Sequence, residues 1–517
     1  MRQNHRPTRV LVLALAAASL LTSACGARLT DDQRAQALAQ TGGTSGSGST
    51  GAGTTGDTTT GTSGTGTSGS GTSGTGTTGT SGSTGTGSAG TSTSGTSGTS
   101  GTSGTSGTSG SGGPITDTRP LPPGGNGGST DKGITGDTIT IANISDVSGA
   151  VPGLFEDAQL AVKAYFKYFE AREKTIYGRK IKLLSLDARL DAGGNREKSI
   201  QACNEAFAGV GSVSAFDQGG ADVIRDCGLA DIRGLSTTEQ MKAVPNAYPI
   251  DTAGTGGKRS MAVFGWAKER FPEAVKKAAY IFIDGEVTRQ LTEQDVEGST
   301  KLLGYNWVDT PAIGITETNY GPVVQRLKSK DAQYVTFVGA YQQAASFALE
   351  FKRQNYKPKV FQPTVTAYTP DFIKQAGEAA EEVYVAVEAS LNEEVDRNPE
   401  LKLYTQWLNQ VKPGATPTGI GQFAWGAAAL FVEKMKAIGP KPTRKALLAE
   451  IGKVKKYTGN GLFPPQDVGG RELGTCTKIV QIRGGRFNRF EPSAPGSNRC
   501  NDLVYNVKTK RGEPGVN

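Results

Sequence analysis

Cysteine and histidine supply many of the nucleophiles and metal ligands of proteins, and this chain has few of them. Its 517 residues include five cysteines and one histidine. The histidine, His5, lies in a basic segment that precedes an apolar run from Val10 to Leu21. A basic start, a short apolar segment and small residues before a cleavage site indicate a secretory signal peptide over residues 1–24. The mature chain then lacks histidine, which excludes Ser-His-Asp and Cys-His catalysis and histidine-ligated metals. We expect no enzyme, no metal and no cofactor.

Cys25 follows the small residues Ser23 and Ala24 directly. The segment Leu21-Thr22-Ser23-Ala24-Cys25 resembles the lipobox of bacterial lipoproteins, in which the cysteine is acylated and becomes the first mature residue. Thr22 departs from the usual leucine, and an ordinary signal peptide with an incidental cysteine is the alternative. The resemblance implies a protein held by lipid at the extracytoplasmic face of the cell membrane.

The other four cysteines form two evenly spaced pairs. Cys203 and Cys227 are 24 positions apart, and so are Cys476 and Cys500. In an oxidising compartment an even number of cysteines indicates disulfides, and zinc-type CxxC spacing is absent. The sequence therefore predicts the disulfides Cys203–Cys227 and Cys476–Cys500.

The region 25–133 contains little that can form a core. Residues 41–113 are almost entirely Gly, Ser and Thr, and such a segment cannot bury enough apolar surface to become ordered. We expect a lipidated N-terminus followed by a disordered linker. Removal of the signal peptide, with three arginines and no acidic residue, leaves about +5 of the formal charge of +8. Because basic and acidic residues are interleaved, no nucleic-acid partner is expected.

From Ile134 onward, β-rich runs alternate with amphipathic helical segments. Thr138 to Ile144 is rich in β-branched residues, and Phe155 to Arg172 places apolar residues on one helical face, namely Ala158, Ala161, Val162, Tyr165, Phe166 and Phe169. Further helices are expected at 195–209 and 220–230, and further strands at 180–186, 210–216 and 232–236. This alternation is typical of βα units on a parallel sheet.

The alternation starts again after Pro249. We expect helices at 258–270, 288–303, 319–329, 342–354 and 420–437, and strands at 278–284, 310–315, 332–338 and 358–364. Strands at 478–482 and 502–507 predict a β extension that Cys476 and Cys500 staple. A chain of this length rarely keeps one core, so two α/β lobes are predicted.

Several short motifs occur in a fixed order along the globular part. They are Ser148-Gly-Ala-Val-Pro-Gly153 after the first strand, Asp251 before the second lobe, Tyr280-Ile-Phe-Ile-Asp284, the turn at Gly304, and Asn319 to Lys328 followed by Ala332 to Gly339. This order resembles that of type I extracytoplasmic (periplasmic) solute-binding proteins, the branched-chain amino-acid-binding-like receptors of ABC transporters. The resemblance covers nearly all of 134–510. Cys203 and Cys227 fall where members of that family commonly carry a disulfide.

The resemblance implies an α/β fold of two doubly wound parallel-sheet lobes joined by a three-segment hinge. The three crossings are expected near 252–256, 384–388 and 455–462. Lobe 1 would comprise 134–253 with 388–460, and lobe 2 would comprise 254–387 with 461–517, including the disulfide-stapled extension.

The resemblance also implies a function. Such receptors capture a small solute in the cleft between the lobes and deliver it to an ABC transporter permease, as in amino acid transport. We expect a small polar solute, a permease and, through the N-terminal lipid, the membrane as partners. The alternative is a cell-envelope signalling or assembly protein of the same fold that acts through protein contacts.

The binding site is expected beyond the carboxyl ends of the strands, where ligands of open α/β sheets lie. The loops there contain small hydroxyl residues that suit a polar head group, although the same residues also suit helix caps and turns. The expected ligand-binding residues are Ser148, Phe155, Phe216, Asp217, Gln218, Ser236, Thr237, Asp284, Tyr341, Gln343 and Tyr368.

One loop departs from the pattern of amino-acid receptors. Those receptors commonly place a carboxylate for the α-ammonium shortly after the glycine that corresponds to Gly339, but Gly339-Ala-Tyr-Gln-Gln-Ala344 contains no acid. A buried ammonium without a carboxylate is costly, whereas Gln342 or Gln343 suits a neutral amide, hydroxyl or carbonyl. An acid from another loop, such as Asp284, is the alternative. We therefore predict a small polar or partly aromatic solute that does not need an α-ammonium group.

Overall fold

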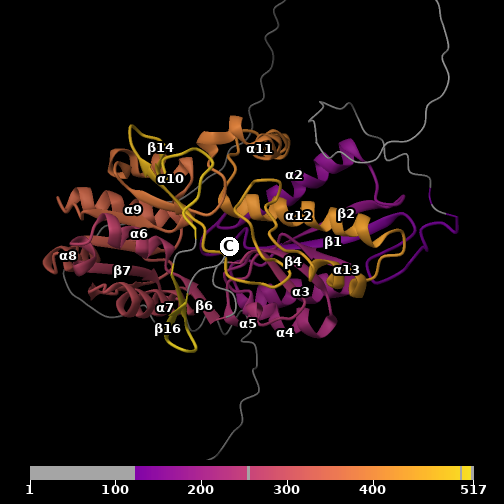
Figure 1. Ribbon diagram of the computed structural model, residues 1–517, viewed down its shortest axis with the longest axis horizontal. Coiled ribbons are helices and arrows are strands. Elements are labelled where there is room, and N and C mark those ends of the chain that lie inside the picture. Colours follow the sequence, from indigo (N-terminus) through magenta and orange to yellow (C-terminus); the bar gives the residue numbers. More distant parts are fainter. Residues whose placement is uncertain (1–120, 122, 253–256, 501–502, 514–517) are drawn as a thin grey trace, which may run out of the picture. The chain divides into compact units, whose positions relative to one another are not determined.

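The computed structural model describes residues 121, 123–252, 257–500 and 503–513, which belong to one compact unit, 105–517 (Figure 1). The predicted signal peptide, Cys25 and the Gly/Ser/Thr-rich segment lie outside the described residues. Within the described ranges, no helix is long and apolar enough to cross a membrane. The predicted α/β class with parallel sheets is confirmed.

The first sheet has the strand order β2-β1-β3-β4-β5, and all its pairs are parallel. Its strands are β1 (Thr138–Ser145), β2 (Lys180–Asp187), β3 (Ala208–Val210), β4 (Ala230–Leu235) and β5 (Ala247–Asp251). One face packs against α2 (Glu156–Arg172), α11 (Pro399–Val411), α12 (Gly419–Ile438) and α13 (Arg444–Ile451). The other face packs against α3 (Ala192–Glu205), α4 (Gln218–Cys227) and α5 (Glu239–Lys242). Helices on both faces make this sheet doubly wound.

The second sheet repeats this plan with the order β11-β10-β7-β8, and β9 also pairs with β7. Its strands are β7 (Ala278–Ile283), β8 (Trp307–Asp309), β9 (Ala312–Ile313), β10 (Tyr334–Val338) and β11 (Val360–Pro363). The helices α8 (Gly321–Ser329), α9 (Tyr341–Arg353) and α10 (Pro370–Ala376) belong to the core on one face. The core on the opposite face includes α6 (Ala262–Arg270) and α7 (Glu286–Leu303).

Helix α2 shows how the hydrophobic pattern positions an element. Every residue of its predicted apolar face is buried, which confirms the helical period of three to four residues. Tyr165 packs edge-on against Trp425 of α12, with the ring centroids 5.0 Å apart. This contact ties the beginning of the chain's globular part to a helix more than two hundred residues later.

Two small antiparallel sheets complete the unit. One joins β12 (Tyr384–Val387), β13 (Lys478–Ile482) and β14 (Phe487–Glu491), and the other joins β6 (Lys258–Ser260), β15 (Val504–Asn506) and β16 (Arg511–Glu513). The sequence predicted a helix from residue 258, but Lys258–Ser260 pairs with β15 and the helix begins only at Ala262. Local sequence patterns cannot predict pairing between segments so far apart in the chain.

Three other local predictions were shifted by backbone constraints. The helix predicted at 195–209 ends at Glu205, and the strand predicted at 210–216 is the shorter β3, because Gly211 adopts φ of 70° directly after it. The strand predicted at 310–315 is reduced to the two residues of β9, after Pro311, and β8 precedes the predicted range. Strand β5 was missed because it contains Pro249, and it lies at the edge of its sheet, where proline is tolerated.

The chain passes between the two sets of cores three times. The passages lie between Ile250 and Met261, between Leu391 and Leu401, and between Val468 and Ile479. The second and third come later than the crossings expected near 384–388 and 455–462. In particular, the ring of Phe463 packs against that of Phe423 of α12, with the ring centroids 5.1 Å apart, so the segment after 460 packs with the first sheet. The residue limits of the lobes remain a prediction.

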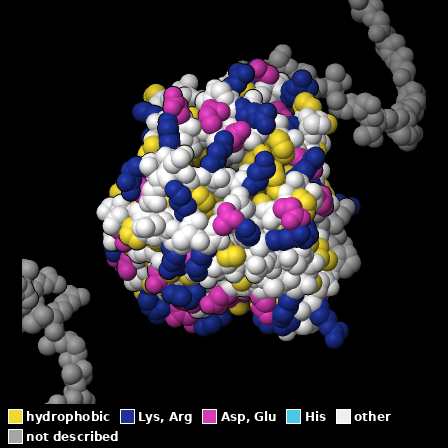
Figure 2. Space-filling model, turned by 90° about the vertical axis from the view of Figure 1, so that its left-hand side faces the viewer, with side chains coloured by type: hydrophobic (Ala, Val, Ile, Leu, Met, Phe, Trp, Pro, Cys, Tyr) yellow, Lys and Arg dark blue, Asp and Glu magenta, His cyan; other side chains and the backbone are white. Residues whose placement is uncertain are grey.

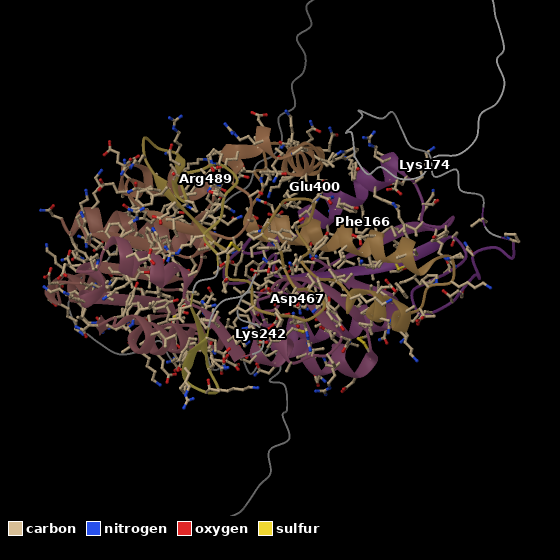
Figure 3. All side chains as sticks on the ribbon, in the orientation of Figure 1. Phe166, Lys174, Lys242, Glu400, Asp467 and Arg489 are labelled. Carbon is tan, nitrogen blue, oxygen red and sulfur yellow. A yellow bond between two sulfur atoms is a disulfide. The ribbon has the colours of Figure 1, made fainter. Side chains whose placement is uncertain are left out.

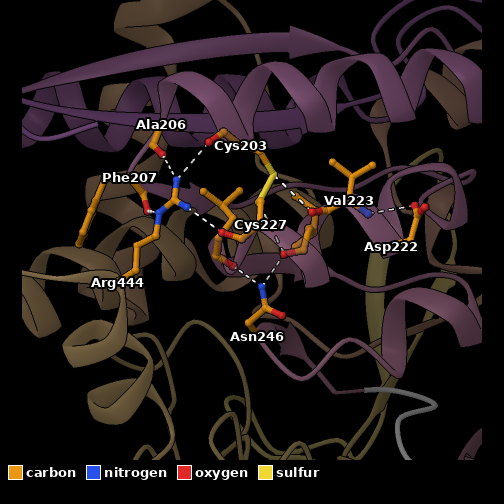
Figure 4. The surroundings of a disulfide bond; sticks show 10 residues. Cys203, Ala206, Phe207, Asp222, Val223, Cys227, Asn246 and Arg444 are labelled. Carbon is orange, nitrogen blue, oxygen red and sulfur yellow. Dashed lines mark hydrogen bonds between the residues drawn. A yellow bond between two sulfur atoms is a disulfide. The ribbon is translucent and has the colours of Figure 1, made fainter. Parts of the chain in front are cut away.

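Both predicted disulfides are present, Cys203–Cys227 and Cys476–Cys500. Figure 4 shows that the first joins α3 to α4 beside the guanidinium group of Arg444. This group donates hydrogen bonds to the carbonyl oxygens of Ala206, Phe207 and Cys227 at 2.6, 3.1 and 3.0 Å. A cation near the carboxyl ends of two helices also interacts favourably with their dipoles. The disulfide and Arg444 therefore lock the same corner of the first sheet.

Charge on the surface is mixed, as the sequence indicated. Figure 2 shows basic and acidic side chains interspersed over the face that it presents. Exposed pairs such as Arg196 with Asp222 and Lys352 with Glu378 are examples. A mixed surface of this kind favours solubility over binding to a uniformly charged polymer.

We predict that replacing Cys203 and Cys227 together by serine lowers the free energy of unfolding by about 3 kcal/mol, the value expected for a loop of this length. Denaturant titration of the two proteins measures the difference. Arg444 should keep the corner assembled, so the folded variant should retain native far-ultraviolet circular dichroism. A change below about 0.5 kcal/mol would contradict the stabilising role of the crosslink.

Candidate solute-binding cavity

A cavity of about 440 Å³ lies between the two parallel sheets of the compact unit. Its walls come from residues that follow β1, β3 and β4 on one side and β7, β10 and β11 on the other. In doubly wound sheets the carboxyl edges open a crevice where the strand order reverses, which here is between β1 and β3 and between β7 and β10. The cavity is therefore where parallel-sheet geometry places a ligand.

The first wall is held by the carboxylate of Asp217, which is fully buried. It accepts hydrogen bonds from the backbone N–H groups of Thr237 and Thr238 at 2.9 and 3.0 Å and from the Thr238 hydroxyl at 2.6 Å. It also pairs with the buried guanidinium of Arg233 at 3.2 Å. Arg233 pairs in addition with Asp231 at 2.7 Å. Asp217 was predicted to bind ligand, but the structure instead places it behind the wall, where it fixes the loop after β4.

Asp146 and Ser148 position the loop after β1. The carboxylate of Asp146 accepts from the N–H groups of Leu190 and Ala215 at 3.1 and 2.7 Å, which joins three loops at the sheet edge. Burial raises the pKa of Asp146 to about 6. The hydroxyl of Ser148 donates to Asp187 at 2.5 Å and does not line the cavity. Ser148 thus contacts the end of β2 in this structure, and its predicted ligand role remains a prediction.

On the second wall, the start of α9 supports the cavity through its own backbone. The side-chain oxygen of Gln343 accepts from the N–H of Ala340 at 3.2 Å, and its nitrogen donates to the carbonyl of Ile315 at 3.0 Å. Gln343 lines the cavity, and the oxygen and nitrogen of its side chain each form a hydrogen bond within the protein. Its neighbour Tyr341 does not line it.

Tyr368 also lies away from the cavity. Its hydroxyl donates to Glu393 at 2.6 Å and accepts from the N–H of Asn392 at 2.8 Å, and its ring packs against Phe487. Burial raises the pKa of Tyr368 well above its usual range. Tyr368 is therefore a core residue of the second lobe and not the ligand contact that the sequence suggested.

The predicted residues that the structure does bring to the cavity come from both walls. They are Phe155, Phe216, Gln218, Ser236, Thr237, Asp284 and Gln343. Asp284 forms an ion pair with Arg289, which also lies at the start of α7. Two of these residues keep a buried polar atom without a hydrogen-bond partner among the described residues, namely the Ser236 hydroxyl and the Gln218 side-chain oxygen.

The cavity also has a charged part that the sequence did not reveal. Arg259 donates to both oxygens of Asp295, at 2.6 and 3.1 Å, and the Tyr280 hydroxyl donates to the same carboxylate at 2.9 Å. Arg259 follows the first passage between the lobes, and Glu388 comes just after β12. Burial, together with the nearby charge of Asp251, raises the pKa of Glu388 to about 8.

Only the tertiary structure assembles this group. Arg259 lies on β6, Tyr280 on β7, Asp295 on α7 and Glu388 after β12. None of these residues forms a motif with another in the sequence. The one local hint is that Asp295 occupies the inward face of α7, with Thr292 and Ser299, where apolar residues are expected.

Comparison with known proteins identifies the family of this chain. Residues 138–486 match the family model described as periplasmic binding protein. The chain belongs to this periplasmic binding protein family, whose members are substrate-binding transport proteins. No curated protein matches the chain.

Solved structures share the fold at low sequence identity. The leucine-binding protein LivK of Thermotoga maritima is 16% identical, with a TM-score of 0.57, and the match covers 68% of this chain and 98% of that one. A fatty acid ABC transporter substrate-binding protein of Thermomonospora curvata is 16% identical, with a TM-score of 0.59 and coverage of 74% and 95%. A solute-binding protein of an R. palustris ABC transporter, solved with benzoate, is 14% identical, with a TM-score of 0.58 and coverage of 70% and 98%.

We predict that Asp217→Ala lowers the free energy of unfolding by about 3–5 kcal/mol, because it leaves the buried guanidinium of Arg233 without one of its carboxylate partners. Asp222→Ala is the matched control, since it breaks the solvent-exposed pair with Arg196 and should cost no more than about 1 kcal/mol. Urea titration of both variants measures the difference. Equal losses in the two would show that Asp217 does not hold the wall.

Proposed function

We propose that this protein is a membrane-anchored extracytoplasmic receptor that captures a small solute in the cavity between its lobes and delivers it to an ABC permease. The observation that supports this most directly is the cavity itself, which lies at the carboxyl edges of two doubly wound sheets in a periplasmic binding protein. Its walls contain buried polar atoms that no described residue satisfies. A bound solute would supply the missing partners.

Lobe closure would couple capture to delivery. Contacts already join the two sides, because the Gln240 side chain donates to Glu286 at 3.0 Å from α5 to α7. Such contacts at the cavity rim can strengthen when a solute fills the space behind them. A closed, loaded form would then be the form that a permease recognises.

Lipid anchoring is the second part of the proposal. Cys25 follows the signal-like segment, and residues 41–113 consist almost entirely of Gly, Ser and Thr. A tether between the lipid and the receptor would let the receptor search the space around a membrane-bound permease without leaving it.

We expect a metabolite library to contain solutes that raise the melting temperature of the purified protein. A ligand at one hundred times its dissociation constant adds about 2.7 kcal/mol. Ala215→Trp, which fills part of the cavity wall, should remove the shift, and Ala312→Trp, at an exposed position outside the cavity, should retain it. A shift that persists in Ala215→Trp would place the solute elsewhere.

Anchoring is tested separately in a bacterial host fed a labelled fatty acid. The label should enter the native protein, and Cys25→Ala should abolish labelling and release the protein from membranes. Cys203→Ala is the control, since a disulfide cysteine should not affect acylation. Equal labelling of the Cys25 variant would rule out this anchor.

A further inference from the structure

The lining of the cavity is mainly apolar. Its apolar side chains include Val151, Leu154, Phe155, Leu190, Phe216, Leu235, Val263, Phe264, Ile283, Val287, Leu291, Ile315, Val338 and Ile420. They come from both walls, so most of a bound molecule would contact hydrocarbon. Burial of apolar surface contributes about 25 cal/mol per Å². The cavity thus favours a solute with an apolar body.

The described cavity lining contains two cationic side chains, and each forms an ion pair with a carboxylate of the protein. Arg259 makes the two-fold contact with Asp295 described above. Lys242, labelled in Figure 3, pairs with Glu239 at 2.9 Å. An anionic solute would enter an apolar space in which no described cation is left to neutralise it. Burial of such a charge is strongly unfavourable.

Most acids of the lining are engaged as well. Asp284 pairs with Arg289, Asp295 with Arg259, and Glu286 accepts from Gln240. Asp251 also has a partner within the protein. The exception is Glu388, whose carboxyl forms no hydrogen bond or ion pair with a described residue.

Glu388 is therefore the group that decides the charge of the site. It faces Asp251, which disfavours its ionisation, and Arg259 and Lys478, which favour it. Burial lowers the pKa of Lys478 itself to about 7, so Lys478 is only partly charged at neutral pH. Burial outweighs the cations, and with a pKa of about 8 Glu388 keeps its proton at neutral pH. Lys478 is itself occupied, because it donates to the carbonyl of Ala389 at 2.6 Å. A protonated carboxyl can donate one hydrogen bond and accept others.

We propose that the cavity takes an electrically neutral solute with an apolar body, whose polar groups hydrogen-bond to the carboxyl of Glu388 and to the hydroxyl of Ser236. This inference rests on the proposed function and specifies the solute class of the same site. Ser236 is only 2% exposed, and its hydroxyl has no partner among the described residues. An amide, alcohol or ester offers the matching donors and acceptors without a charge.

The test uses three probes with the same chain length and different charges, namely octanamide, octanoate and octylamine. Each competes at pH 7 with the neutral fluorescent probe N-phenyl-1-naphthylamine on the purified full chain. Octanamide should displace the fluorophore at a concentration at least about ten-fold lower than the other two, since transfer of their charges is costly.

The pH dependence identifies Glu388. Octanamide should bind about ten-fold more weakly at pH 9 than at pH 7, because a group of pKa about 8 loses most of its proton over that range. Glu388→Gln should remove this dependence while binding persists. Glu393→Gln, at a carboxyl outside the cavity that accepts a hydrogen bond from Tyr368, should retain it.

A pair of serine variants tests the second contact. Ser236→Ala should weaken octanamide binding about five-fold, the loss expected for one hydrogen bond, without lowering stability. Ser329→Ala is the control and should leave binding unchanged, since Ser329 lies outside the cavity at the end of α8 and its hydroxyl donates to the carbonyl of Arg326.

The outcomes separate this inference from the proposed function. Tightest binding of octanoate or octylamine, or equal binding of all three, would overturn the neutral class and leave solute capture standing. The same holds for a pH dependence that survives in Glu388→Gln. Failure of the fluorophore and of every probe to bind would count against solute capture itself.

Discussion

The carboxylate of Asp217 is the contact on which the first wall of the cavity depends. A buried carboxylate must be compensated by hydrogen bonds and an opposite charge, and here the loop after β4 provides the hydrogen bonds and Arg233 the charge. These hydrogen bonds also fix the loop, because a different orientation of Thr237 and Thr238 would leave the buried carboxylate of Asp217 without its donors. Ser236 is thereby held at the cavity surface although its own hydroxyl forms no hydrogen bond with a described residue.

The two walls of the cavity are built on different principles. The first is a network of buried charges behind a polar loop, with Asp146 and Asp217 each joining several segments. The second relies on the start of α9, where Gln343 satisfies backbone groups at Ala340 and Ile315. The charged part lies near the passages between the lobes, where Arg259 and Glu388 approach from different segments. A movement of the lobes would therefore alter this part most.

Polar residues at strand ends have two uses, and this protein shows both. Ser148, Asp217 and Tyr368 satisfy other parts of the fold, whereas Ser236 and Gln218 leave polar atoms unpartnered at the cavity. Serine occurs in both groups, and all five residues follow the carboxyl end of a strand. The difference lies in which partners the folded chain brings within reach.

The sequence by itself determined the alternation of strands and helices, the doubly wound class, the disulfide pairs and the edge of the sheets at which the cavity opens. The alternation follows from local periodicity, and the position of the cavity follows from the rule that parallel strands share one carboxyl edge. The disulfide pairs follow from four remaining cysteines in an oxidising compartment, and the doubly wound class was implied by the family resemblance. Only the tertiary structure decided that Lys258–Ser260 is a strand, that Leu462 and Phe463 pack with the first sheet, and that Arg259, Asp295 and Glu388 meet at one cavity. Each of these depends on contacts between residues far apart in the chain, where burial and charge compensation, rather than local pattern, determine which groups come together.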